Sequence, residues 1–184
     1  DTVGWPTFGY WPKYDSLTHE QLYYRWIERA WRGGVRMITA LLVDNNVLCE
    51  IYPFKENSCN EMDGVRLQAQ RLRELERYID AQEGGPGRGW LRVVTSPEQA
   101  REVIDQGKLA VVLGIEVSNL FDCFSVPREG FPTCDEEHVR ERLDHYQELG
   151  VRVLFPVHKY DNAFSAGDGM KGIIELGNFV SSGH

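Results

Sequence analysis

The chain of 184 residues has the length of one domain and can bury a hydrophobic core. Its 42% hydrophobic and 26% charged residues are typical of a soluble globular protein and exclude disordered and collagen-like classes. A net charge of −8 argues against nucleic acid as the main partner, and no apolar run approaches the roughly 18 residues that a membrane span needs.

Turn and capping residues divide the chain into alternating helices and strands. The aromatic-rich residues 1–17 are typical of an ordered entry loop. Apolar residues at helical spacing, with capping residues and glycines at the ends, predict helices at about 18–33, 61–82, 96–107 and 136–149. Apolar runs predict strands at 35–43, 109–116 and 151–157, with a short extended piece at 90–95. This order predicts a parallel sheet, open or closed.

Residues 109–116 give the clearest prediction of a buried strand. Its sequence, LAVVLGIE, has no polar alternation, which indicates a strand buried on both faces in a sheet covered by helices. Glu116 stands at its end, and ligands bind at the carboxyl ends of parallel strands. The alternative is that Glu116 faces solvent in a loop.

Polar side chains follow the ends of successive expected strands at Asp44, Glu116 and His158. In neighbouring parallel strands they would share one rim, where a carboxylate and an imidazole could hold a metal or a substrate. We therefore expect Glu116 and His158 to point into the same cavity. A structural, hydrogen-bonded histidine is the alternative for His158. The histidines expected to be solvated on helices are His19, His138 and His145.

The four cysteines lie in two loops, at Cys49 and Cys59 and at Cys123 and Cys134. An even number of loop cysteines favours a disulfide within each loop, and hence an oxidising compartment, secreted or periplasmic. Other pairings and free thiols stay open. A zinc knuckle is disfavoured because the chain has no CxxC pair.

The segment VTSPEQAREVIDQGKLAVVLGIE, followed after the next helix by YQELGVRVLFPVHKYDN, resembles the membrane (renal) dipeptidase family of zinc peptidases. RAWRGGVRMITALLV resembles the entry to an earlier strand of that family, and the likeness covers about residues 25–165. The resemblance implies an α/β fold with parallel strands alternating with helices, part of a TIM-like (β/α)8 barrel. Residues 1–184 would then be a single, incomplete barrel domain.

The resemblance also implies roles for individual residues. Glu116 matches a carboxylate that bridges two zinc ions, and His158 matches a histidine that contacts the substrate at the reacting carbonyl. Asp161 and Asn162 lie near the same presumed rim and are expected to bind the substrate. The implied reaction is zinc-dependent hydrolysis of an amide-type bond in a small peptide-like substrate, with attack by metal hydroxide.

The chain departs from the family pattern in three places. It lacks the His-x-Asp metal pair of the first strand, and Val117 and Ser118 stand where the family has Gly-Gly. Only residues 159–184 follow His158, and His184 does not end an apolar strand, so two histidine ligands and an aspartate are not supplied. We therefore expect a longer barrel with its first strand upstream and its last four downstream.

A second hypothesis is a non-catalytic extracellular binding or structural module built on the same barrel. The aromatic entry loop and the two cysteine loops would then be contact surfaces. A homo-oligomer or larger assembly stays open under either hypothesis.

Overall fold

The computed structural model describes residues 24–167 and 172–182. The chain divides into two compact units, residues 1–35 and 36–184. The described part of the first unit contains α1 (Tyr24–Arg32). The expected entry loop, the expected start of the first helix, His19 and His184 lie outside the described residues.

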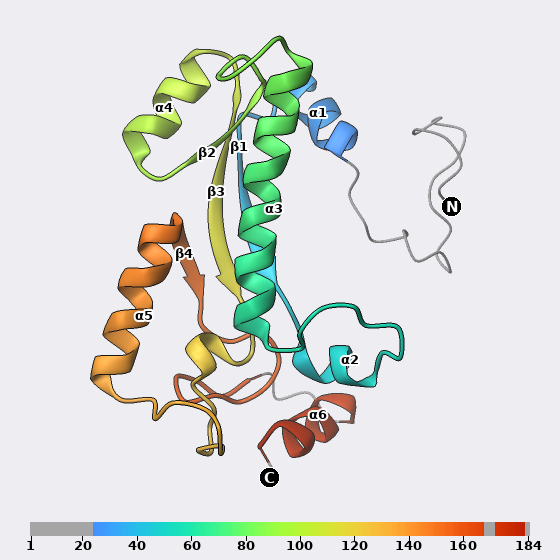
Figure 1. The fold of residues 1–184 in the computed structure, drawn as a ribbon, viewed down its shortest axis with the longest axis vertical. Coiled ribbons are helices and arrows are strands. Elements are labelled where there is room, and N and C mark those ends of the chain that lie inside the picture. Colours follow the sequence, from blue (N-terminus) through green and yellow to red (C-terminus); the bar gives the residue numbers. More distant parts are fainter. Residues whose placement is uncertain (1–23, 168–171, 183–184) are drawn as a thin grey trace. The chain divides into compact units, whose positions relative to one another are not determined.

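The second unit contains a four-stranded parallel sheet with β3 (Leu109–Glu116) at its centre (Figure 1). β1 (Met37–Val43) pairs along one edge of β3 up to its last residue. β2 (Leu91–Val94) pairs with the first half of β3, and β4 (Val151–Phe155) pairs with its second half. The expected α/β class with a parallel sheet is confirmed. Within the described residues the sheet is open and does not close into a barrel.

Three helices connect the strands close to the expected bounds: α3 (Glu61–Gln82), α4 (Pro97–Asp105) and α5 (Glu136–Leu149). Asn60, Ser96 and Asp135 precede them, and each side chain accepts a hydrogen bond from a backbone N–H in the first turn. Gly150 ends α5 in the left-handed conformation, with φ at 104°, which glycine adopts without strain.

Three short elements were not expected from the sequence: α2 (Asn46–Ile51), the 3-10 turn η1 (Leu120–Asp122) and α6 (Ile173–Ser182). The first two lie in loops that follow β1 and β3. Val47 of α2 packs with Tyr160 and Ile174 in a small cluster of its own, which joins α2 to α6. Among the described residues, no helix is both long and apolar enough to span a membrane.

One face of the sheet is covered by α3 and α5, whose side chains share the main core with β1, β3 and β4. The buried members of this core include Leu42, Met62, Val65, Ala69, Leu113, Ile115, Tyr146 and Val151. Fully burying one such aliphatic side chain contributes about 1.5–3 kcal/mol. The core thereby fixes the first turns of α3 beside the carboxyl ends of β1 and β3.

Of the described residues, few cover the second half of the opposite face. Ala100 of α4 packs against Ala110 in the first half of β3. Around the second half of β3, apolar side chains of the neighbouring strands are 37–50% exposed: Leu41, Val43, Val153 and Phe155. Gly114 keeps this face closely packed, because a Cβ there would lie 2.8 Å from Leu41 and 3.2 Å from Val153.

Both expected disulfides are present. Cys49 is bonded to Cys59 in the loop after β1, and Cys123 to Cys134 in the loop after β3. The two bridges close loops of similar length, with sequence separations of 10 and 11 residues. They differ in environment, because Cys123 is fully buried in the main core whereas Cys49 lies outside it.

This difference gives a test of the core around Cys123. Replacing either cysteine pair with serine should lower the free energy of unfolding by about 3 kcal/mol through chain entropy. Cys123→Ser with Cys134→Ser should cost about 1–3 kcal/mol more, because it also buries a hydroxyl in an apolar site. Urea denaturation of both double variants measures this. Equal losses would contradict the packing of Cys123 described here.

Candidate functional site

The carboxyl ends of β3 and β4 bring Glu116 and His158 into contact. Glu116 is the last residue of β3 and lies opposite Phe155, the last residue of β4. His158 follows three residues later, and its Nδ1 lies 2.8 Å from Glu116 Oε1. The two side chains are 22% and 21% exposed, so the pair is accessible to small molecules. The two strand-end residues that the sequence singles out therefore meet at one rim.

The donor and acceptor roles in this pair follow from its chemistry. An ionised carboxylate only accepts hydrogen bonds, so Nδ1 of His158 donates to Glu116. Among the described residues, Nε2 of His158 has no hydrogen-bond partner and is the nitrogen left for a ligand or a proton. A carboxylate that fixes the tautomer and direction of an imidazole prepares it for proton transfer, hydrogen-bond donation or metal binding.

Two further carboxylates lie close to this rim. Asp44 directly follows β1, and burial raises the pKa of its carboxyl, opposed by a hydrogen bond of 2.7 Å from the N–H of Asn45. Glu61, the first residue of α3, is only 2% exposed, and burial raises its pKa too. The charge of Asp44 raises the pKa of Glu61 further and that of His158 lowers it. Asp44, Glu61 and His158 therefore belong to one electrostatic cluster.

Glu61 holds two loops together. Its Oε1 accepts a hydrogen bond of 3.0 Å from the N–H of Asn46, and its Oε2 accepts one of 2.5 Å from the N–H of Asn119. Asn46 follows β1 and Asn119 follows β3, so one side chain fixes the exits of two adjacent strands. Sequence reasoning missed Glu61, because an acidic residue in the first turn of a helix ordinarily faces solvent and stabilises the helix dipole.

A second set of hydrogen bonds joins the loops after β3 and β4. Ser118 Oγ accepts two backbone N–H groups of the loop after β4, at 3.1 and 3.3 Å. The Asn162 side-chain amide donates to the carbonyls of Ser118 and Pro156 at 2.7 and 2.6 Å, and Asp161 accepts a hydrogen bond of 2.6 Å from the N–H of Gly167. Asp161 and Asn162 thus stabilise the loop that carries His158, while their contact with a substrate stays a prediction.

The loop after β3 also contains two consecutive left-handed residues, Phe121 and Asp122, with φ near 60°. Such a backbone persists in non-glycine residues only where surrounding contacts hold it. Here Asn60 donates to the carboxylate of Asp122 at 2.6 Å, and Nε2 of His138 lies 2.8 Å from the carbonyl oxygen of Phe121. The expectation that His138 is solvated was wrong: it is 8% exposed, because it satisfies this buried carbonyl. His145 is exposed as expected.

The described residues do not form a complete metal site. A zinc ion takes three or four protein ligands, and no group of three or more histidine, cysteine, aspartate or glutamate side chains in the described part of the chain could hold a metal ion. Glu116 and His158 are suitable ligand types, but they would be two members of a larger set. Asp44 and Glu61 do not complete the set, since Glu61 is committed to two backbone N–H groups.

The hydrogen bonds by which Glu61 joins the two loops can be tested by replacing its side chain. Glu61→Ala should lower the free energy of unfolding by about 2–5 kcal/mol, because it leaves the buried N–H groups of Asn46 and Asn119 without acceptors. Urea denaturation gives this value. Glu74→Gln is the control and should have little effect, because Glu74 is partly exposed on the same helix and its contacts are with Gln70 and Arg71 of its own helix.

Glu61→Gln tests the titration separately. The folded-state pKa of Glu61 lies above its ordinary value of 4.5, so the stability that it contributes is greatest below the unfolded-state pKa and declines as pH rises through the folded-state pKa. The difference in unfolding free energy, original chain minus variant, should therefore fall as the pH rises above about 4.5, the ordinary pKa of the carboxyl. A difference that is constant or rises with pH would contradict the burial of Glu61.

Comparisons of the chain with protein-family models, curated proteins and solved structures gave no match. The site is therefore defined by its own geometry, the contact between Glu116 and His158 at the ends of adjacent parallel strands. The resemblance to membrane dipeptidases stays a prediction from the sequence.

Proposed function

We propose that this chain is part of a dipeptidase-like, zinc-dependent hydrolase of amide-type bonds that acts on small peptide-like substrates. Glu116 is a metal ligand in this proposal, and His158 contacts the reacting carbonyl. The observation that carries it is the 2.8 Å contact between His158 Nδ1 and Glu116 Oε1 at the carboxyl ends of β3 and β4. This end of parallel strands is where α/β enzymes build their active sites.

A closed (β/α)8 barrel is the second part of the proposal. The exposed apolar side chains Leu41, Val43, Val153 and Phe155 alternate along strands that flank Glu116, as inward-facing residues of a barrel do. Further strands on the free edges would bury these side chains and remove the edges at the same time. The same strands would have to supply the metal ligands that the described residues lack.

Because the described residues hold only part of a metal site, the chemistry that we derive is limited to the chain's own groups. Glu116 orients the imidazole of His158 by accepting from Nδ1. Nε2 then points away from the carboxylate and, when protonated, can donate a hydrogen bond to an oxygen on which negative charge develops. The two zinc ions implied by the resemblance would supply an activated water.

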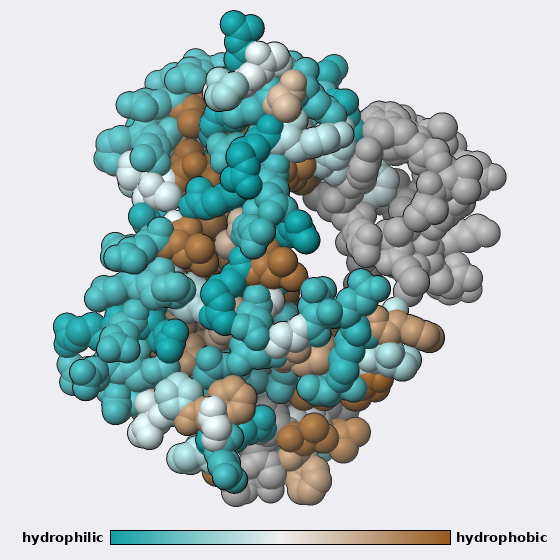
Figure 2. All heavy atoms as spheres, in the orientation of Figure 1, coloured by the Kyte–Doolittle hydropathy of each residue, from teal (hydrophilic) through white to brown (hydrophobic). Residues whose placement is uncertain are grey.

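The two disulfides support a secreted or periplasmic location in this proposal, since such bonds persist in oxidising compartments. One observation favours the second candidate function, a non-catalytic binding module. Hydrophobic side chains gather at the surface near α2 and α6 (Figure 2). The exposed apolar residues there are Leu48, Ile51, Tyr52, Phe54, Leu176, Phe179 and Val180. Exposed apolar patches of this kind mark interaction surfaces.

Metal content separates the two candidates. The complete natural protein, purified without chelator, should contain about two zinc ions per chain by elemental mass spectrometry. Glu116→Ala should lose zinc, and His158→Asn should retain zinc but hydrolyse a dipeptide about 100-fold more slowly. Glu74→Gln, at a partly exposed position of α3 away from this rim, should change neither value. A protein without zinc and without peptidase activity would overturn the hydrolase and favour the binding module.

A further inference from the structure

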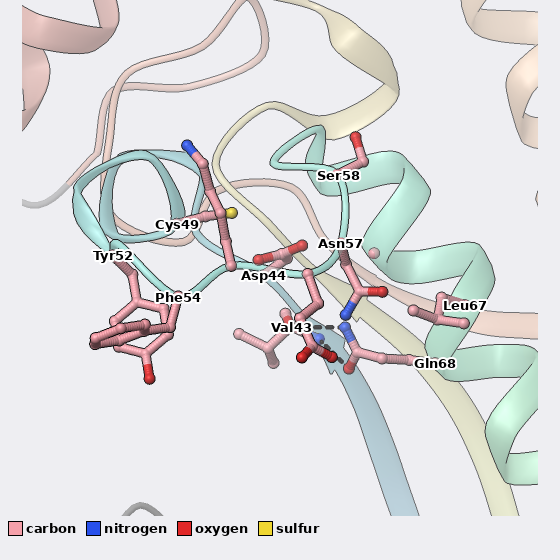
Figure 3. A pocket seen from close by; sticks show the side chains of 12 residues that line it. Val43, Asp44, Cys49, Tyr52, Phe54, Asn57, Ser58, Leu67 and Gln68 are labelled. Carbon is pink, nitrogen blue, oxygen red and sulfur yellow. Dashed lines mark hydrogen bonds between the residues drawn. The ribbon is translucent and has the colours of Figure 1, made fainter.

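A pocket of about 430 Å³ lies beside the carboxyl end of β1, between the start of α3 and the disulfide-closed loop 49–59 (Figure 3). This volume is in the range of pockets that hold small organic ligands. Its lining includes Asp44, Tyr52, Phe54, Glu56, Asn57 and Gln68. Glu116 and His158 do not line it, so it is distinct from the pair described above.

The loop supplies an aromatic wall. The rings of Tyr52 and Phe54 pack edge to face, with centroids 5.8 Å apart. Phe54 is 77% exposed, so its ring offers apolar surface that the fold leaves unused. The Cys49–Cys59 bond closes the loop that carries both rings, which reduces the entropy lost when a ligand orders them.

The charged groups of the lining make the pocket suited to a cation. Asp44 is half-buried, and Figure 3 shows it among the lining side chains. Glu56 adds a second carboxylate. The one cation in the lining, Lys55, is already paired with Glu50, which cancels its charge. The lining therefore presents unpaired negative charge beside aromatic rings.

The polar groups next to Asp44 are fixed by the fold. Gln68 exchanges two hydrogen bonds with the backbone of Val43, accepting at 3.2 Å and donating at 2.8 Å, and so covers the edge of β1. Asp44 rests against α3 at Gly64, where a Cβ would lie 2.0 Å from its Oδ2. The position of the carboxylate thus depends on a glycine in the first turn of α3.

We infer that this pocket binds an organic ammonium group carried on an aromatic or other apolar body. The ammonium would pair with the Asp44 carboxylate, and its body would pack on Tyr52 and Phe54, whose ring faces also attract cations. This inference uses neither a metal nor the Glu116–His158 pair. It therefore goes beyond the proposed hydrolase and stands or falls separately from it.

Phenethylammonium is the probe, titrated into the ¹⁵N-labelled full chain with both disulfides intact and followed by NMR. Amide signals of residues 44, 52 and 54–58 should shift, with a dissociation constant on the order of 1 mM, as is typical of a ligand of this size. The anion 3-phenylpropionate, which has a similar body and the opposite charge, should cause no shifts there. Equal shifts with the anion would overturn the inference.

Asp44→Asn removes the charge at almost constant volume and should weaken phenethylammonium binding about tenfold. Phe54→Ala should weaken it several-fold by removing the exposed ring. Glu74→Gln, a charge-matched control away from the lining, should bind as the original chain does. Unchanged binding by Asp44→Asn would overturn the inference.

Gly64→Ala keeps the test decisive even if Asp44→Asn folds poorly. Alanine has a higher helix propensity than glycine, so α3 should be no less stable, but the new methyl group must displace the Asp44 carboxylate. We expect binding to weaken about tenfold while the urea midpoint is unchanged or higher. Full binding by Gly64→Ala would show that the ligand does not depend on the position of Asp44 and would overturn the inference.

Discussion

The pairing of β3 on both edges is the constraint on which the rest of the structure depends. β1 follows one edge of β3 to its last residue, and β4 follows the second half of the other edge, so Val43, Glu116 and Phe155 lie in one row across the sheet. The loops after three strands must therefore leave the sheet at the same rim. Side chains that are far apart in the sequence, such as Asp44, Glu116 and His158, lie near one another there because the parallel strands all end on the same side of the sheet.

At this rim, polar groups divide into those that the fold uses and those that it leaves accessible. Three of these side chains are buried and form hydrogen bonds with backbone groups, which link the loops to one another: Glu61, Ser118 and Asn162. Glu116 and His158 remain partly exposed and satisfy only each other among the described residues. The side-chain oxygens of Glu61, Ser118 and Asn162 all accept hydrogen bonds, which offsets the cost of their burial. Glu116 and His158, in contrast, keep atoms for a ligand.

Much of the architecture was predictable, and the parts that were not share a cause. Apolar runs and capping residues predicted three helices and the order of strands, and loop position predicted both disulfides, since these signals are local in sequence. The neighbour relations of β3 with β1 and β4 and the burial of Glu61 and His138 depend on contacts between residues 17 to 73 positions apart in the sequence. In the contacts of Glu61 and His138, the partner atoms are the backbone N–H of Asn119 and the backbone carbonyl of Phe121. A backbone contact cannot be predicted from the residue type of the partner.

Asp44, which follows β1, and Glu116, which ends β3, illustrate why the position of a carboxylate decides what it can bind more than its residue type does. Glu116 faces an imidazole on a sheet face whose apolar neighbours are exposed, so its chemistry depends on what covers that face. Asp44 faces a pocket whose walls are already assembled by a disulfide loop and by α3, so its chemistry needs no further strand. The ammonium pocket is therefore a property of this chain alone, whereas hydrolysis would be a property of a completed barrel.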